Sequence, residues 1–508
     1  MEITLTSFVL LSFLLSAALV LALKQKKHHR KGPKPPGPPG WPIIGNIFDL
    51  GTIPHQTLYE LRPKYGPVLW LKLGSVNTLV IQSAEAAAEL FKNHDQASCD
   101  RRSRDAFTAH EYNQGSLVVG RYGPYCRMLR RLYMTELMSN KRVNETAQIR
   151  RKCIHDMIQY IEKDAAAARA KGEAGELDLS HFLFIMVFNL MGNLVLSRDL
   201  VDSQSKEGRE FREAMDKFMK WGGMPNVVDF FPVLKWWDPQ GIKRNMKRDM
   251  GQVMEIIAGF LKERIDEKRM EKENQTKDFL DVVLEHQGKE EADQLTQHNV
   301  IIFILEIFLA GSETTSNTLE WAMAELLRNP ESMRKVKEEL NRVVGPNKKV
   351  EESDIEELPY MQAMVKETLR LHPPAPFLIP RNAMEDTNFM GYVIHKDTQI
   401  LVNAWAIGRD PDAWEDPLMF EPERFLGSKI DYKGQNFELI PFGSGRRICV
   451  GMLLAHRLLH LGLASLLHYF DWELPINTTP ADVDMNERNG IAVRKLIPLK
   501  AIPNKKEL

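Results

Sequence analysis

The sequence predicts a mainly α-helical protein with a small β part, preceded by a single transmembrane helix. Two long stretches with helical spacing of apolar residues carry the helical part of this prediction. One lies within Asp293–Asn329 and ends at Pro330, and the other covers Ile355–Leu371 and ends before a His-Pro-Pro sequence. Short strand-like runs lie at Pro67–Leu73 and Thr78–Ile81, and another lies near Thr398–Val402.

The amino terminus predicts the membrane segment. Ile3–Leu23 carries no charge, and at 1.5 Å per residue it reaches about 32 Å, enough to cross the hydrocarbon core of a bilayer. Basic residues follow this run between Lys24 and Lys31, which favours an uncleaved anchor over a signal peptide and places the rest of the chain on the cytoplasmic side. Pro33–Gly40 then predicts a stiff hinge, with a plain linker or a ligand for a proline-reading domain as alternatives. The predicted divisions are an anchor over 1–23, a basic and proline-rich hinge over 24–46, and a folded body over 47–508.

The amino-acid composition of the chain argues against several classes of protein. The 508 residues include 67 Lys and Arg against 68 Asp and Glu, so the net charge of -1 argues against a general nucleic-acid binder. A hydrophobic share of 44% is enough for a large core and too high for a disordered chain. The four cysteines show no CxxC pair and are too few for a disulfide scaffold, which favours a reducing compartment.

The segment Pro441–Gly451 carries the strongest chemical signal. A lone cysteine is usually a small buried hydrophobe, which is the interpretation that we give to Cys99 and Cys153. Cys449, however, directly precedes an apolar helix, whose N-terminus stabilises a thiolate, and glycines flank it. A thiolate is the ligand that promotes O–O cleavage at haem iron. A dinucleotide-binding loop is excluded because Ile448 stands where a third glycine is required, so the electrons are expected from a separate flavoprotein.

This segment resembles the haem-binding signature F-x-x-G-x-R-x-C-x-G of the cytochrome P450 family, matched by Phe442, Gly445, Arg447, Cys449 and Gly451. The resemblance implies the cytochrome P450 fold over 47–508, haem b held by these five residues with Cys449 as the metal ligand, and electrons from NADPH through NADPH–cytochrome P450 reductase. The anchor and hinge resemble plant microsomal members, which implies a single-pass protein of the endoplasmic reticulum membrane with a cytoplasmic catalytic domain. Stretches such as Trp321–Pro330 and Val402–Pro411 resemble the plant subgroup that oxidises monoterpenoids, including geraniol and iridoids.

A second motif lies inside the long helix, at Ala310–Thr315. Serine and threonine in a helix commonly bond back to the preceding turn, so the motif alone favours a structural role. The small residues Ala310 and Gly311 narrow the helix where a substrate and dioxygen could approach. The motif resembles the oxygen-activation motif of the family. On that resemblance Thr314 and Glu313 are catalytic, with Thr314 donating a hydrogen bond and Glu313 supplying protons.

Further residues are assigned by resemblance to supporting roles. Glu367 and Arg370, three residues apart on one helix face, join Arg424 in the Glu–Arg–Arg network of the family. Arg130, Arg381 and Arg447 are expected to bind the haem propionates, because buried carboxylates require paired charge. Cys126 stands where the family usually has Trp, so one propionate contact is lost or replaced, and Cys126→Trp is expected to tighten haem retention if the space remains open.

The expected activity is insertion of one oxygen atom into a small apolar plant metabolite. The substrate pocket is expected to be apolar and to include Ala310, Ala375, Phe377, Leu378 and Ile491, together with the 104–119 loop. A terpenoid substrate is favoured, with phenolic or fatty-acid-derived substrates next. Two rivals are a haem enzyme that rearranges hydroperoxides or dehydrates substrates without a reductase, and a non-catalytic haem-binding protein.

Overall fold

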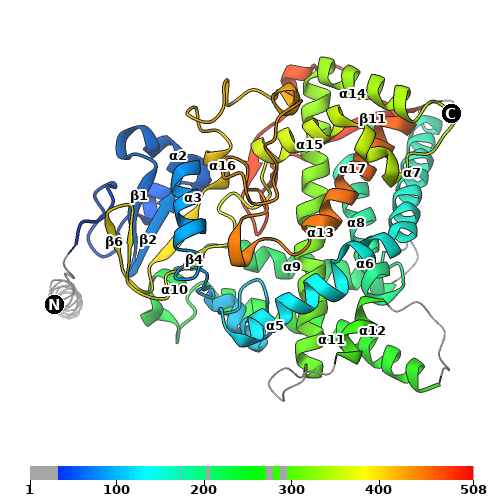
Figure 1. The fold of residues 1–508 in the computed structure, drawn as a ribbon. Helices are drawn as coiled ribbons and strands as arrows, with labels where there is room; N and C mark the ends of the chain where they lie inside the picture. Colours follow the sequence, from blue (N-terminus) through cyan, green and yellow to red (C-terminus); the bar gives the residue numbers. More distant parts are fainter. Residues whose placement is uncertain (1–31, 173, 202–205, 271–277, 287–294, 507–508) are drawn as a thin grey trace, which may run out of the picture.

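A computed structural model describes residues 32–172, 174–201, 206–270, 278–286 and 295–506. Helices form most of the molecule and strands a small part of it (Figure 1), which confirms the mainly α prediction. The helices are α2 (Pro54–Tyr65), α3 (Ala84–Asn93), α4 (Tyr112–Gly115), α5 (Pro124–Leu132), α6 (Asn140–Glu145), α7 (Ala147–Ala170), α8 (Leu179–Leu196), α9 (Lys206–Gly223), α10 (Val227–Phe230), α11 (Ile242–Met270), α12 (Phe279–Glu285), α13 (Gln297–Arg328), α14 (Pro330–Val343), α15 (Pro359–Leu371), α16 (Ala404–Ile407) and α17 (Met452–Tyr469). The strands are β1 (Val68–Leu73), β2 (Val76–Ile81), β3 (Leu177–Asp178), β4 (Arg381–Asn382), β5 (Thr387–Phe389), β6 (Tyr392–Ile394), β7 (Gln399–Val402), β8 (Phe470–Glu473), β9 (Glu487–Arg488), β10 (Arg494–Lys495) and β11 (Lys500–Lys505).

Helix α13 is the central element of the helical part. Thr296 caps its start by accepting from the backbone N–H of Asn299, whose side chain accepts from the N–H of Thr296 in return. The helix ends at Arg328 because Pro330 begins α14. Its packing partners include α8, α11, α15 and α17, so most of its 32 residues are buried.

Helix α15 starts later than the apolar pattern predicts. Ile355 lies in a 3-10 turn over Glu352–Glu357, and Pro359 opens the α-helix itself. Because proline has no N–H to contribute to the ladder, it is well placed at the first helical position.

The main sheet joins distant parts of the sequence in the order β1-β2-β7-β4. Strands β1 and β2 form an antiparallel hairpin, β7 runs parallel to β2, and β4 is antiparallel to β7. Buried side chains on both faces of β2 and β7 pack into two apolar clusters on opposite sides of the sheet. Separately, β9 and β10 form a short antiparallel pair, and β10 contacts α13.

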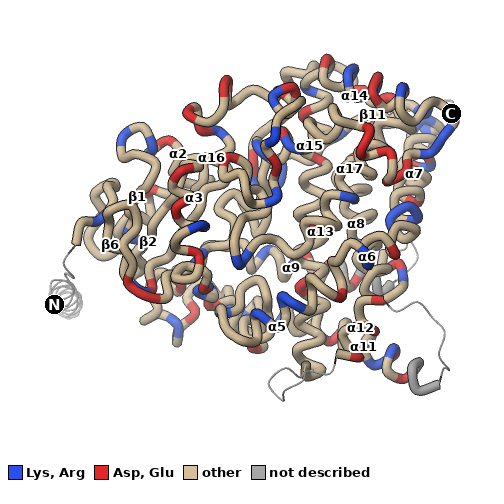
Figure 2. The backbone as a smooth tube through the Cα atoms, in the orientation of Figure 1, with Lys and Arg blue, Asp and Glu red and all other residues tan. Residues whose placement is uncertain are grey.

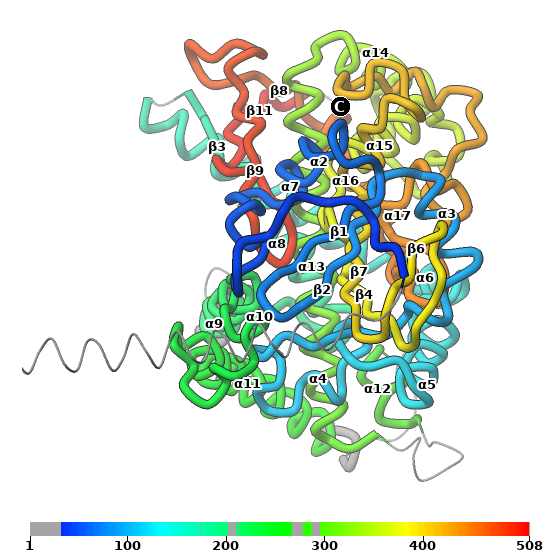
Figure 3. Tube along the Cα trace, turned by 90° about the vertical axis from the view of Figure 1, so that its left-hand side faces the viewer, coloured from blue at the N-terminus to red at the C-terminus, as the bar shows by residue number. Residues whose placement is uncertain are grey.

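The described part of the predicted hinge lies against the sheet. The carbonyl of Pro36 accepts from the N–H of Trp70 at 2.8 Å, and the N–H of Asn46 donates to the carbonyl of Lys72 at 2.6 Å. Gly45 has a φ of +67°, and a Cβ there would come within 1.9 Å of the Lys72 carbonyl oxygen. Figure 3 shows this dark-blue segment crossing the face of the molecule that carries β1 and β2. Residues 33–46 therefore extend the folded body.

The predicted anchor lies outside the described residues. Within the described ranges, α8 and α13 are long and apolar enough to span a membrane, but both are core helices that are mostly buried. Lysine and arginine alternate with aspartate and glutamate along the outer helices, whereas α8 and α13 carry few charges (Figure 2).

Candidate active site

Cys449 lies in a tight loop that leads directly into α17. A 3-10 turn over Gly445–Arg447 precedes it, and its N–H donates to the carbonyl of Phe442 at 2.9 Å. Burial raises the pKa of the thiol, while the backbone N–H groups of Gly451 and Met452 donate to the sulfur and act in the opposite direction. The Cys449 side chain is nevertheless accessible to solvent, although many protein atoms lie around the sulfur. One side of the Cys449 sulfur is therefore open to solvent, and the N–H groups at the N-terminus of α17 lie on its other side.

Asp95 ties this loop to the sheet. Its carboxylate accepts from the Arg381 side chain of β4 at 2.7 Å and from the backbone N–H of Arg446 at 2.8 Å. Gly445 lies so close that a Cβ there would meet the carboxylate at 2.5 Å. Arg381 also donates to the carbonyl of Ser444 at 3.0 Å. These contacts fix the position of the loop relative to β4.

Buried guanidinium groups gather beside the cysteine loop. Arg101 and Arg381 are only 6% and 4% exposed, and the pKa of Arg101 lies well below its usual value because of burial and then repulsion by Arg381 and Arg447. Arg101 donates to the carbonyls of Ile379 and Pro380, and its Nε has no hydrogen-bond partner among the described residues. This excess of buried positive charge fits a buried dianion such as the two propionates of haem.

Helix α5 contributes a fourth cation. Burial lowers the pKa of Arg130, whereas Cys449 and Cys126 raise it, which places the guanidinium near both sulfurs. Cys126, one turn earlier on α5, is 3% exposed and also lies near Arg101. Together with the accessible sulfur of Cys449, the four arginines form a donor set that suits haem.

Arg101 is the member of this group that sequence reasoning missed. It stands in the run Arg101-Arg102-Ser103-Arg104, which is typical of a solvated charged segment. No spacing rule distinguishes it from its neighbours, since its burial depends on contacts with Ile379 and Pro380 far along the chain.

The middle of α13 brings the predicted catalytic residues onto different faces of the helix. Ala310 is exposed on an otherwise buried helix, and the hydroxyl of Thr314 donates to its carbonyl at 2.7 Å. Gly311 faces α8, because a Cβ there would meet Met191 at 2.7 Å. Of the two small residues, Ala310 therefore lies on the exposed face of the helix, and Gly311 lies on the face that packs against α8. Glu313 is buried, and as a direct neighbour of Thr314 it points away from it.

Glu313 faces the β9–β10 hairpin and α9. Burial raises the pKa of this carboxyl to about 7, and Arg494 and the N–H of Ala492 only partly offset that rise. Asp216 of α9 adds a further small increase. Arg494 is half exposed and approaches the carboxylate at 3.8 Å. A buried acid with a pKa near 7, linked to solvent by a loosely held cation, can exchange protons at neutral pH.

Glu367, Arg370 and Arg424 form a tight buried network. Arg370 donates to both oxygens of Glu367 at 2.6 Å, and Arg424 donates to one of them at 3.1 Å. Arg370 also donates to the carbonyls of Gly408, Pro417 and Met419. The two segments that the sequence analysis assigns to one network therefore meet, which joins α15 to the chain that follows α16.

The predicted pocket residues are placed less uniformly. Phe377 packs toward the apolar cluster under β1, and Leu378, with a φ of +53°, packs toward the cluster on the other side of the sheet. Ile379 is the more exposed residue of this turn. Ile491 packs against Gly222 at the end of α9, and Ala375 is half-buried. Their contact with substrate remains a prediction.

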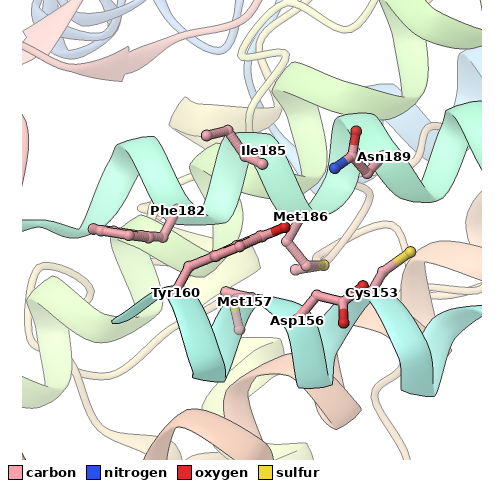
Figure 4. Close-up of a pocket in the computed structure, with 8 residues that line it drawn as sticks. All are labelled: Cys153, Asp156, Met157, Tyr160, Phe182, Ile185, Met186 and Asn189. Atoms are coloured by element: carbon pink, nitrogen blue, oxygen red, sulfur yellow. The ribbon is translucent and has the colours of Figure 1, made fainter. Parts of the chain in front are cut away.

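A small hollow between α7 and α8 is separate from all of these residues (Figure 4). Its lining is mostly apolar and includes Cys153, Met157 and Phe182. Burial raises the pKa of the Cys153 thiol to about 12, so the thiol is neutral at physiological pH. The thiol that lines this hollow is therefore not reactive at that pH.

Comparison with known proteins agrees with this geometry. The Cytochrome P450 family model matches residues 35–499. The chain is 55% identical to an iridoid oxidase of Catharanthus roseus over 96% of its own length and 95% of that protein, and 40% identical to a geraniol 8-hydroxylase of the same plant over 98% and 99%. A solved zebrafish cytochrome P450 with progesterone superposes with a TM-score of 0.76 at 26% identity, covering 89% of this chain and 99% of that one. The chain therefore belongs to the cytochrome P450 family and is a cytochrome P450 monooxygenase.

Proposed function

We propose that this protein is a membrane-anchored haem-thiolate monooxygenase that oxidises a small apolar terpenoid of the monoterpenoid or iridoid class. Electrons come from NADPH through NADPH–cytochrome P450 reductase at the endoplasmic reticulum membrane. The observation that carries the proposal is the 55% identity with an iridoid oxidase across nearly the whole of both chains. The similarity to a geraniol 8-hydroxylase supports the same substrate class.

Each candidate residue has a role in this function. Haem, when bound, supplies the activation of dioxygen and its insertion into a C–H or C=C bond. Cys449 provides the thiolate ligand, which the N–H groups of Gly451 and Met452 support. Arg101, Arg130, Arg381 and Arg447 would hold the two propionates by charge-assisted hydrogen bonds, and Arg381 and Arg447 also donate to Asp95 and to backbone carbonyls.

The acid and the alcohol of α13 move protons. Thr314 Oγ1 donates to the Ala310 carbonyl, and a rotation about χ1 lets it donate toward the exposed side of the helix instead. Glu313 holds a proton at neutral pH because of its raised pKa, and it regains that proton from solvent on the side of Arg494. A water molecule must bridge the two side chains, since neighbouring residues on a helix do not face each other.

An exposed apolar surface supports attachment to a membrane. Trp41, Phe48, Val233, Trp236 and Trp237 are each at least 64% exposed. They lie on neighbouring segments, because the N–H groups of residues 74 and 75 donate to the carbonyls of residues 44 and 230. Exposed tryptophan is enriched where proteins meet the headgroup region of a bilayer. This face and the predicted anchor over 1–23 would then contact the same membrane.

The substrate class is tested with the full-length protein and a plant reductase in microsomes. The panel contains geraniol, iridoid alcohols and aldehydes, sesquiterpene alcohols, phenolic acids and fatty acids, with NADPH and product mass spectra. We expect oxygenated products from the monoterpenoid or iridoid members and none in the matched Cys449→Ala protein. Turnover confined to phenolic or fatty-acid substrates would overturn the proposed class.

Membrane attachment is tested by fractionation. Full-length protein is expected to stay with the membrane after a carbonate wash, whereas protein lacking residues 2–23 should be released by carbonate or high salt and still bind haem. Full release of the intact chain would contradict the anchor.

A further inference from the structure

We propose that Glu306 of α13 is a positioning residue that fixes the loop segment Ser116–Gly120 over the substrate side of the helix and thereby sets which position of the substrate is oxidised. The inference deepens the proposed function and rests on it for the substrate used in one arm of the test. Glu306 is 3% exposed. It matches no motif in the sequence.

The carboxylate is occupied by this one segment. Glu306 accepts from the N–H of Leu117 at 2.9 Å, from the N–H of Val118 at 2.8 Å and from the hydroxyl of Ser116. The same hydroxyl accepts from the N–H of Val119 at 2.9 Å. Every backbone N–H from 117 to 119 is therefore held by Glu306 directly or through Ser116.

The other side of the segment is held by the cysteine loop. Arg447, two residues before Cys449, donates to the carbonyls of Leu117 and Gly120, each at 2.9 Å, and to that of Cys99 at 3.0 Å. Gly120 permits the tight turn, since a Cβ there would lie 2.1 Å from the carbonyl oxygen of Ser116. Ser116–Gly120 is thus a tie between α13 and the loop that carries the cysteine.

The charges around Glu306 indicate that this carboxylate positions the Ser116–Gly120 segment and does not stabilise the fold. Burial raises the pKa of Glu306, and its hydrogen bonds from Ser116, Leu117 and Val118 together with the charge of Arg447 only partly offset that rise. The phenols of Tyr112, Tyr125 and Tyr133 lie close enough that Glu306 further raises the pKa of each. A buried carboxylate in such surroundings is more costly than an apolar residue of similar size, unless its hydrogen bonds fix a needed conformation.

The position of Glu306 links the tie to the site. Glu306 and Ala310 are four residues apart and so lie on one face of α13, and Ala310 is the exposed position of that face. Gly115, next to the tie, packs against Ile302 one turn earlier on the helix. Movement of residues 117–119 therefore changes the space available above Ala310, where the proposed substrate is expected to bind.

The test compares Glu306→Gln with Glu320→Gln in the full-length holoenzyme. In Glu306→Gln the new NH₂ group faces one of the two backbone N–H groups, which then has no acceptor. Loss of one such buried hydrogen bond changes the equilibrium for local opening of the segment about tenfold. We expect hydrogen exchange at the Leu117 and Val118 amides to rise about tenfold or more, and a second oxidation position to appear in the products. Glu320, buried on the same helix, accepts from the N–H of Leu499 at 2.8 Å, so its variant should change neither readout.

The Ser116 hydroxyl offers a second, milder test of the same segment. Ser116→Ala removes only the hydroxyl, so it should raise exchange at Val119 and shift the product ratio less, and it carries the test if Glu306→Gln does not fold. Unchanged exchange and unchanged products in both variants would overturn the proposal, as would an equal change in Glu320→Gln. Exchange needs no substrate, so raised exchange in a protein that oxidises no terpenoid would reject the proposed substrate class while retaining the tie.

Discussion

The Glu367 network and the Glu313–Thr314 pair both place polar groups inside the helical body, but they hold these groups differently. Both oxygens of Glu367 accept from Arg370 at 2.6 Å, and Arg370 is otherwise occupied by backbone carbonyls. Among the described residues, Glu313 pairs only with the half-exposed Arg494 at 3.8 Å, and Thr314 donates only to its own helix. Fully paired charge gives a rigid support, whereas a loosely held acid and alcohol stay free to exchange protons. We therefore expect the Glu367 network to support the fold and the Glu313–Thr314 pair to move protons.

The largest expected effect comes from replacing Cys449. Cys449→Ala is expected to abolish monooxygenase activity and the thiolate-type Soret band of the reduced protein with carbon monoxide, because alanine has no sulfur to bind the iron. Cys153→Ala is the matched control, since that thiol is buried and neutral. A Cys449→Ala protein that keeps the thiolate spectrum would refute the assignment.

The next largest effect is a loss of stability when the Glu367 network is broken. Glu367→Gln removes the charge that balances Arg370 and Arg424, and breaking one member of a buried ion pair costs about 3–5 kcal/mol of unfolding free energy. Thermal melts of the holoprotein measure it. Glu331→Gln, at an exposed pair with Arg334, is the control and should leave the melting temperature nearly unchanged. Equal melting temperatures for the two variants would show that the network does not support the fold.

On the side of proton movement, Thr314→Ala is expected to affect the use of electrons more than substrate binding. The substrate-induced spectral shift should persist, while product per NADPH falls about tenfold or more and peroxide rises, because general acid–base groups contribute at least that much. Thr318→Ala is the control, as its hydroxyl donates to the Thr314 carbonyl at 2.8 Å on the buried part of the same helix. Undiminished product per NADPH in Thr314→Ala would contradict the role.

These two regions also differ in how far the sequence predicts them. The helical period of α13, the strands of the main sheet and the cysteine segment are local patterns, and the structure places them within a few residues of the predicted bounds. The start of α15 was predicted too early because the apolar pattern continues through a 3-10 turn. Motif resemblance supplied Glu367 and Arg424, which lie 57 residues apart.

The residues that were not predicted act through long-range contacts. Arg101 meets carbonyls 278 and 279 residues away, and Glu306 meets a segment nearly 190 residues earlier. Nothing in their local sequence marks them, because their function depends on burial that only the complete fold creates. Gly311 also depends on a distant contact, since its motif suggests an open path whereas the fold places it against Met191 of α8.

Cys126 tests whether the support around the arginines has adapted to a small side chain. The sequence alone favours a gain from Cys126→Trp, but Cys126 is 3% exposed and its neighbours on α5, Met128 and Leu129, are equally buried. Inserting a large ring into a filled core costs about 1–3 kcal/mol. We therefore expect lower thermal stability and faster haem release in Cys126→Trp, with product identity unchanged. Slower haem release would show that the space is open after all.

The smallest expected effect is a shift in the pH dependence of proton supply. Glu313 donates from its protonated form, so product per NADPH should fall as the pH rises through its pKa of about 7. Arg494 favours the charged carboxylate and so lowers this pKa, and its removal in Arg494→Gln must move the fall to higher pH. Because Arg494 is half exposed, the pair is worth about 1 kcal/mol or less, which corresponds to a shift below about one pH unit. Arg488→Gln, on the opposite strand of the same hairpin, removes an equal charge from the residue that pairs with Arg494 and should leave the profile unchanged. An identical shift in both variants would mean that Glu313 senses only the net charge of the hairpin, and no shift in Arg494→Gln would mean that protons reach the site without this carboxyl.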